Sequence, residues 1–129
     1  MNVYAIQLSR WLLGLCWVYQ GFFPKLYAIA PLERQLTATM GFTVEISDVI
    51  TRVAGVSEIV FGLLLIVFYK TKIIHFLNIL ALLSLLLYVA LMMPSLLIEA
   101  FNPITTNLTM MALSVVILVS IRPAELWPD

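Results

Sequence analysis

The sequence predicts an all-α integral membrane protein folded as a four-helix bundle with up-down-up-down topology. Hydrophobic residues make up 63% of the 129 residues and charged residues only 11%, against about 45 to 50% and about 25% in soluble domains. Four apolar runs approach the roughly 20 residues that a helix needs to cross a bilayer. They lack the alternating pattern of strands, and a bilayer requires backbone hydrogen bonds to be satisfied within helices or a closed barrel. These runs therefore favour helices.

The four predicted spans belong to one transmembrane domain, residues 1–129. They cover residues 4–23, 49–69, 73–93 and 104–121. The first is expected to end near Pro24, because proline cannot continue the helical hydrogen bonds, and Lys25 is expected to reach the lipid headgroups as an anchor. Ser47 and Asp48 are acceptable N-caps for the second span. Only a few residues separate the second span from the third, which makes these helices antiparallel neighbours.

Two connections carry structure of their own. The loop of residues 26–48 is expected to lie at the interface, with a short amphipathic helix over residues 31–40 that Gly41 ends. It is either an ordered linker or, less favoured, a functional lid. Residues 95–101 are too apolar for a free loop and too short to span, so a re-entrant or interfacial turn is predicted. Asn102 and Pro103 then supply an N-cap and a first helical residue.

Charge and residue counts exclude several classes of protein. Seven basic and seven acidic residues cancel, so no basic face for nucleic acid is expected. The single cysteine, Cys16, excludes an intramolecular disulfide and a Cys-x-x-Cys redox pair, and is expected to pack in a helix. His75 has no second ligand at a suitable spacing, so no metal or haem site is predicted.

Basic residues predict the orientation of the spans. Arg10, Lys70, Lys72 and Arg122 fall on one side, whereas Lys25, Arg34 and Arg52 fall on the other. The positive-inside rule then favours both termini in the cytoplasm. The aromatic Trp127 near the end of the chain is expected to anchor at the interface.

Glu58 is the feature that points to function. It is the only charge in an apolar run that extends to Tyr69, and an ionisable residue inside a membrane-length segment marks a functional site by default. Counting ~1.5 Å of rise per residue places Arg10 and Glu58 at depths that differ by ~7 Å, within reach of two long side chains. The sequence leaves two interpretations open: a buried Arg10–Glu58 pair that fixes helix register, or a Glu58 that faces a cavity and its ligand.

Small residues predict which helices meet. On the first span Arg10, Gly14, Trp17 and Gly21 recur at helical spacing, and on the second span Thr51, Gly55, Glu58 and Gly62 do the same. Each set lies on one helix face. Because packing drives the association of membrane helices, small residues at this spacing allow close approach. The first two spans are therefore expected to pack through these two stripes.

Aromatic and amide side chains at similar estimated depth suggest a ligand. They are Trp17, Tyr19, Gln20, Tyr88 and Asn107. Rings with a few polar groups suit a quinone or another flat apolar molecule. The alternative, which is commoner for aromatics at this spacing, is that they are core or belt residues.

Three stretches resemble a known family: residues 10–25 with their Tyr-Gln-Gly-Phe-Phe-Pro-Lys end, residues 54–62 with Ala-Gly-Val-Ser-Glu, and residues 101–107. They are similar to the DoxX-like family of small bacterial four-helix membrane proteins. The resemblance implies a location in the bacterial inner membrane and links to quinone or thiol redox chemistry, since the family name derives from a subunit of a thiosulfate:quinone oxidoreductase. Having only Cys16, the chain departs from a thiol-redox pattern.

Two hypotheses follow. In the first, a polar intramembrane cavity binds a small hydrophobic ligand such as a quinone in a redox-associated role; its lining would be Arg10, Trp17, Gln20, Glu58 and Asn107. In the second, the chain is a non-catalytic membrane subunit or scaffold whose Arg10 and Glu58 only hold the bundle together, and whose faces dock a redox enzyme or a second copy. A small transporter is a weaker third idea, because no inverted repeat is visible. The sequence assigns no reaction.

Overall fold

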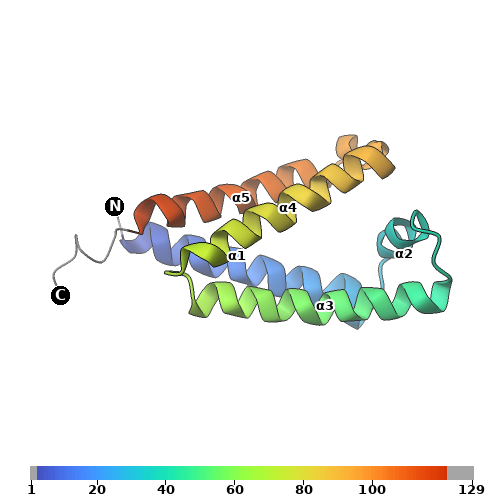
Figure 1. The fold of residues 1–129 in the computed structure, drawn as a ribbon, viewed down its shortest axis with the longest axis horizontal. Helices are drawn as coiled ribbons and strands as arrows, with labels where there is room; N and C mark the ends of the chain where they lie inside the picture. The colour runs from blue at the N-terminus through green and yellow to red at the C-terminus, as the bar shows by residue number, and fades with distance from the viewer. Residues whose placement is uncertain (1–2, 122–129) are drawn as a thin grey trace. The chain divides into compact units, whose positions relative to one another are not determined.

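The computed structural model describes residues 3–121, which are helical with short connections and contain no strand. Its elements, shown in Figure 1, are α1 (Val3–Phe22), the π-helix η1 (Phe23–Tyr27), α2 (Pro31–Ala38), α3 (Val44–Val67), α4 (Lys72–Met92), the 3-10 helix η2 (Pro94–Ile98) and α5 (Pro103–Ser120). The chain divides into two compact units. We call Gly14–Leu64 the central unit, and Met1–Leu13 with Leu65–Asp129 the terminal unit.

Three helices of the described range, α3, α4 and α5, are long and apolar enough to cross a membrane. They correspond to the second, third and fourth predicted spans, so the all-α membrane fold is confirmed. The helix predicted over residues 4–23 forms as α1, but Gln7, Arg10 and Gln20 make it more polar than the other three. The four-span topology therefore stays a prediction. The expected anchor Trp127 and the basic Arg122 lie outside the described residues.

The start of α3 corrects the sequence-based prediction. The helix begins at Val44 rather than at residue 49, and the first-turn amide of Ile46 donates to the hydroxyl of Thr43 at 3.4 Å. Ser47 and Asp48 are thus wrong as N-caps. Their side chains bond to α2 instead, a tertiary contact that the local capping preference does not reveal.

The short helix predicted in the long connection is present as α2. It starts with Pro31 at its first position after an extended Ala30, where the missing proline N–H costs nothing. The chain turns at Gly41, whose φ of +81° lies in the left-handed region that favours glycine. The helix itself ends at Ala38, two residues before the predicted end at residue 40, and Gly41 follows in the turn that leads to α3.

In the central unit α1 and α3 touch through the predicted glycine stripes. A Cβ placed on Gly55 would lie 2.5 Å from the carbonyl oxygen of Gly21, and a Cβ on Gly62 would lie 2.5 Å from that of Gly14. Real Cβ atoms do not approach so closely, so only glycine allows this backbone separation. The rings of Trp17 and Phe61 meet edge to face beside the contact, with centroids 5.1 Å apart. The predicted packing of the two helices is confirmed.

In the terminal unit α4 and α5 pack side by side and are joined through η2 (Figure 1). The side chain of Asn102 caps α5 by accepting from the amide of Thr105 at 3.1 Å, with Pro103 at the first helical position. This confirms the predicted start of the helix. Residues 94–98, within the connection expected to turn at the membrane, form the 3-10 helix η2.

A buried polar network links α4 to α5. The Nε2 atom of His75 lies 2.7 Å from the carbonyl oxygen of Tyr69, which can only accept, so Nε2 carries the proton. Nδ1 then accepts from the hydroxyl of Ser114 at 3.2 Å, and the amide of Asn78 donates to the same hydroxyl oxygen at 2.7 Å. His75, Asn78 and Ser114 are all fully buried. Because each partner is satisfied, the network fixes the register of α4 against α5.

The glycine contact makes a quantitative prediction. Gly55→Ala gains about 0.5 to 1 kcal/mol of helix propensity, but its methyl group meets backbone and must push α1 away, which typically costs about 1 to 3 kcal/mol. We therefore expect a net loss of stability, measured as a lower midpoint of thermal unfolding by circular dichroism in detergent. Ser57→Ala is the matched control, because Ser57 is exposed on the same helix and its loss should change stability by less than about 0.5 kcal/mol. Equal midpoints for the two variants would contradict the tight contact.

Candidate functional site

The π-helix η1 decides where Lys25 lies. Pro24 lacks an N–H, and in an α-helix its ring would clash with the carbonyl of Gln20. The chain winds on as a wider turn, in which the amide of Ala28 donates to the carbonyl of Phe23 at 3.2 Å. The α-helix thus ends at Phe22, close to Pro24 as predicted, but the chain continues as the π-helix η1 to Tyr27. The extra turn brings Lys25 onto the face that carries Gly21, because a Cβ on Gly55 would be 2.9 Å from the Cβ of Lys25.

Lys25 forms the centre of a buried charge cluster. Its Nζ lies 2.8 Å from Oε1 of Glu33 in α2 and 3.4 Å from Oε2 of Glu58 in α3. The three side chains are 11%, 16% and 22% exposed. Glu58 lies nine residues before the end of α3, or ~14 Å along the helix. Lys25, expected as a headgroup anchor, instead pairs with a carboxylate well inside an apolar helix. We call Lys25, Glu33 and Glu58 the Lys25 cluster.

The Lys25 cluster has polar capacity left over. An ammonium group has three N–H donors, and the carboxylate of Glu33 accepts one of them. Among the described residues, Oε2 of Glu58 is buried without a hydrogen bond and meets Lys25 only as an ion pair, and the buried Oγ1 of Thr51 has no partner. Thr51 and Glu58 lie on one face of α3, seven residues apart. When both carboxylates are ionised the cluster carries one excess negative charge, which a proton or a further donor would balance.

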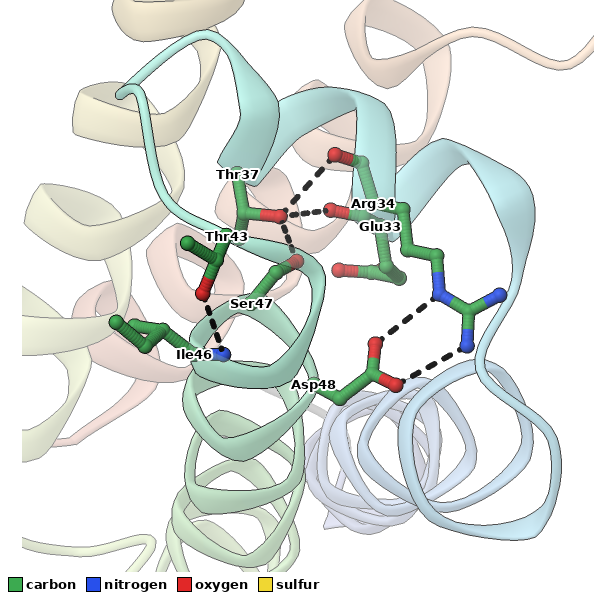
Figure 2. Close-up of polar contacts among 7 residues, drawn as sticks. All are labelled: Glu33, Arg34, Thr37, Thr43, Ile46, Ser47 and Asp48. Atoms are coloured by element: carbon green, nitrogen blue, oxygen red, sulfur yellow. Dashed lines mark hydrogen bonds and ion pairs between the residues drawn. The ribbon is translucent and has the colours of Figure 1, made fainter.

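The helix α2 is held over this cluster by a second group of contacts, shown in Figure 2. The guanidinium of Arg34 donates to both carboxylate oxygens of Asp48, at 3.0 and 3.1 Å, and the hydroxyls of Thr37 and Ser47 are hydrogen-bonded. The hydrogen bonds with Asp48 raise the pKa of Arg34 above its ordinary value. We call these four residues the α2 clamp. The α2 clamp fixes α2 to the first turns of α3, and the bond from Lys25 to Glu33 joins α2 to η1.

The predicted ligand residues fall in different units. Trp17, Gln20 and Glu58 belong to the central unit, whereas Arg10 and Asn107 belong to the terminal unit. Trp17 is half-buried against Phe61, and the side chain of Gln20 is exposed. The amide of Asn107 is buried and donates to the carbonyl of Leu82 at 3.1 Å, so it ties α5 to α4.

Arg10 was a candidate partner of Glu58, and each of the two residues has other neighbours within its own unit. The cation beside Glu58 is Lys25. The guanidinium carbon of Arg10 lies 4.2 Å from the ring centroid of Tyr69, and Nη1 donates to Oε1 of Gln7 at 3.0 Å. Glu58 therefore has a cationic partner, as the cost of a charge in an apolar helix requires, but a different one from that expected.

Two members of the Lys25 cluster were missed by sequence reasoning. Lys25 continues the stripe of Gly14, Trp17 and Gly21 by one further turn, so extending the first helix through Pro24 would have placed it on the correct face. No local signal identifies Glu33, since its contact with Lys25 depends on how α2 folds back across η1.

A double-mutant cycle tests the ion pair. Lys25→Met leaves two buried carboxylates without their cation and should destabilise by about 3 to 5 kcal/mol, whereas Lys25→Met with Glu58→Leu should lose less than the sum of the single changes. Unfolding midpoints in detergent measure the coupling. Arg10→Met with Glu58→Leu is the comparison cycle, and its losses should add. Coupling in the Arg10 cycle alone would reject the assignment of Lys25.

Comparison with known proteins places these residues in a family. A family model described as the DoxX-like family matches residues 14–115, more than half of the chain. The match includes both glycine stripes from Gly14 onward, the Lys25 cluster and the α2 clamp. No curated protein and no solved structure matches the chain. The resemblance of the three sequence stretches is thus confirmed, and the chain belongs to the DoxX-like family.

Proposed function

We propose that this membrane protein binds the headgroup of a small hydrophobic ligand, a quinone or a similar carbonyl-bearing lipid, at the Lys25 cluster. The observation that carries the proposal is the unused polar capacity at Lys25, Glu58 and Thr51, buried in a face of apolar helices. A buried donor or acceptor without a partner costs free energy that a ligand's polar group can recover. A quinone carbonyl accepts hydrogen bonds of the kind that the ammonium of Lys25 and the hydroxyl of Thr51 supply.

The proposed redox association rests on the carboxylates. A quinone takes up two protons when it is reduced to the quinol, so a carboxyl group at its headgroup is what proton exchange would require. Glu58 and Glu33 are the candidate groups in the Lys25 cluster. Phe61, one turn along α3 from Glu58, and Trp17, which packs against it, offer an aromatic surface for the ring of the ligand. Gln20 remains a candidate at the rim, whereas the contacts of Asn107 support a role within the terminal unit.

A second candidate function is favoured by the α2 clamp. Three side chains hold α2 against neighbouring helices, namely Lys25, Arg34 and Thr37. Such a fixed arrangement is what a rigid non-catalytic scaffold for a redox enzyme or a second copy of the chain requires. In that case the charges of the Lys25 cluster are only structural, and no small ligand binds there. Binding of a quinone probe separates the two functions.

The probe experiment uses Trp17 as the reporter. The sequence has three tryptophans, so Trp11→Phe with Trp127→Phe leaves Trp17 alone, beside Phe61. We expect a short-chain benzoquinone with a decyl tail to quench this tryptophan saturably in phosphatidylcholine nanodiscs. Glu58→Gln and Lys25→Met should each weaken binding by about tenfold or more, the equivalent of one charged hydrogen bond.

The control for this experiment is Glu45→Gln, which removes a carboxylate that is exposed on the same helix and should leave the quenching curve unchanged. Circular dichroism verifies that each compared variant keeps its helical signal. Quenching that rises linearly with the quinone and is identical in every variant would mean that the probe only partitions into the bilayer. That outcome rejects the ligand site and favours the scaffold.

The four-span topology and the location are part of the same proposal: a bacterial inner membrane, four helices running up-down-up-down, and both termini in the cytoplasm. We expect Met40→Cys, in a Cys16→Ser background, to react in intact spheroplasts with a maleimide that cannot cross membranes, because Met40 lies in the connection before α3 and is exposed. Lys70→Cys, between α3 and α4, is the control and should react only after lysis. The reverse labelling pattern would show that the orientation is opposite to the one proposed. Labelling of both cysteine variants before lysis would contradict the four-span topology.

A further inference from the structure

Arg10 is a charged residue of α1 whose contacts in the terminal unit are all neutral. Its guanidinium carbon lies 4.2 Å from the ring centroid of Tyr69 and 5.3 Å from that of Trp11, and Nη1 donates to Gln7 at 3.0 Å. None of the ion pairs found within residues 3–121 includes Arg10. Of the five N–H donors of a guanidinium, the side chain of Gln7 takes one. A cation in a membrane helix needs an anion or a similar partner to offset its desolvation.

More positive charge gathers at the same place. The Nζ of Lys70 lies 5.9 Å from the ring centroid of Tyr69, so two cations share one ring. They repel each other unless an anion lies near both. Gln7 also belongs to this group, because its amide donates to the hydroxyl of Tyr69 at 3.4 Å. We call Gln7, Arg10, Trp11, Tyr69 and Lys70 the Arg10 cluster.

The start of α4 adds to this positive potential. Lys72 is its first residue, the first turn carries no acidic side chain, and the side chain of Thr71 makes no capping hydrogen bond. The N-terminus of a helix is the positive end of its dipole, with amides that lack partners. In the described part of the terminal unit the acidic residue is Glu99, which follows η2 at the other end of α4. That helix is ~31 Å long, so Glu99 cannot neutralise this end.

We propose that the Arg10 cluster binds the phosphate group of an anionic phospholipid, with Arg10 and Lys70 as its direct partners. The planar guanidinium matches a phosphate with two parallel hydrogen bonds. Tyrosine and tryptophan are the rings that membrane proteins place at headgroup level, and Trp11 is 47% exposed on a helix of a membrane protein. Free phosphate offers the same chemistry, but a site flanked by apolar, exposed helix surface favours a phosphate that arrives on a lipid.

This site is independent of the proposed quinone site. It uses no residue of the Lys25 cluster, and its ligand is recognised by negative charge rather than by carbonyl groups. Loss of one site should therefore leave binding at the other unchanged.

The experiment uses Trp11 as a local reporter of the lipid next to Arg10. Trp17→Phe with Trp127→Phe leaves Trp11 alone, and the protein is placed in nanodiscs of phosphatidylcholine that contain a small fraction of phosphatidylglycerol with brominated acyl chains. Bromine quenches tryptophan at short range. We expect quenching above that given by the same fraction of brominated phosphatidylcholine, which corresponds to a preference for the anionic lipid.

Variants assign this preference to the Arg10 cluster. Arg10→Gln should reduce the preference by about fivefold, as expected for one basic residue at an anionic surface. Lys70→Gln changes an exposed side chain, so it provides a test that does not depend on a folded Arg10 variant, and it should also lower the preference. Arg52→Gln is the matched control: it removes the same charge from an exposed position in the central unit and should leave the preference unchanged.

Three outcomes would overturn the proposal. The first is equal quenching by the two brominated lipids in the parent protein. The second is an equal loss of preference in Arg52→Gln and Arg10→Gln, which would indicate only the net charge of the protein. The third is loss of the excess quenching when 10 mM inorganic phosphate, on the order of common buffer concentrations, replaces chloride at constant ionic strength, which would assign the site to free phosphate. Persistence of the excess in phosphate supports the lipid.

Discussion

At Gly21 and Gly55 the backbones of α1 and α3 come so close that a single methyl group on either helix would strike the other backbone. The central unit depends on this approach. It brings the end of α1 and the π-helix η1 alongside the middle of α3, where Lys25 reaches Glu58. Without it, an ammonium and a carboxylate on separate helices would each have to find another partner, since a charge cannot remain uncompensated in an apolar environment at low cost.

The buried polar groups between α4 and α5 differ from those of the Lys25 cluster in how they are satisfied. In the terminal unit His75, Asn78 and Ser114 satisfy one another completely, and their function is to fix how α4 meets α5. In the central unit the buried Oγ1 of Thr51 and Oε2 of Glu58 lack hydrogen bonds. A buried network whose members are hydrogen-bonded to one another needs no ligand, whereas unsatisfied buried groups are where a ligand can contribute binding energy. This contrast is why the proposed function is built on the Lys25 cluster.

Much of the fold could be predicted from the sequence because its signals are local. The glycine spacing predicted the α1 and α3 contact, and Asn102 with Pro103 predicted the start of α5. The site was predicted only in part: Glu58 was identified by its charge, but Lys25 was dismissed because Pro24 was taken to end the helix. Ser47 and Asp48 resemble helix caps in the local sequence, yet their side chains form hydrogen bonds with residues of α2. Such contacts between elements have no periodic or local signature in the sequence. Neither the partners of Ser47 and Asp48 nor the net charge of the Lys25 cluster could therefore be predicted.

The π-helix η1 continues the helical chain past Pro24 and so determines the direction in which Lys25 points. A π turn holds one residue more than an α turn, and each residue of an α-helix rotates the chain by about 100°. Lys25 therefore owes its direction to the continuation of the helix past Pro24 as much as to its own chemistry. Removing Phe23 would keep every charged side chain of the Lys25 cluster in the protein and still turn the ammonium by about 100° away from Glu58. In this chain, the number of residues that precede Lys25 in η1 is thus as much a determinant of the site as the identity of the lysine.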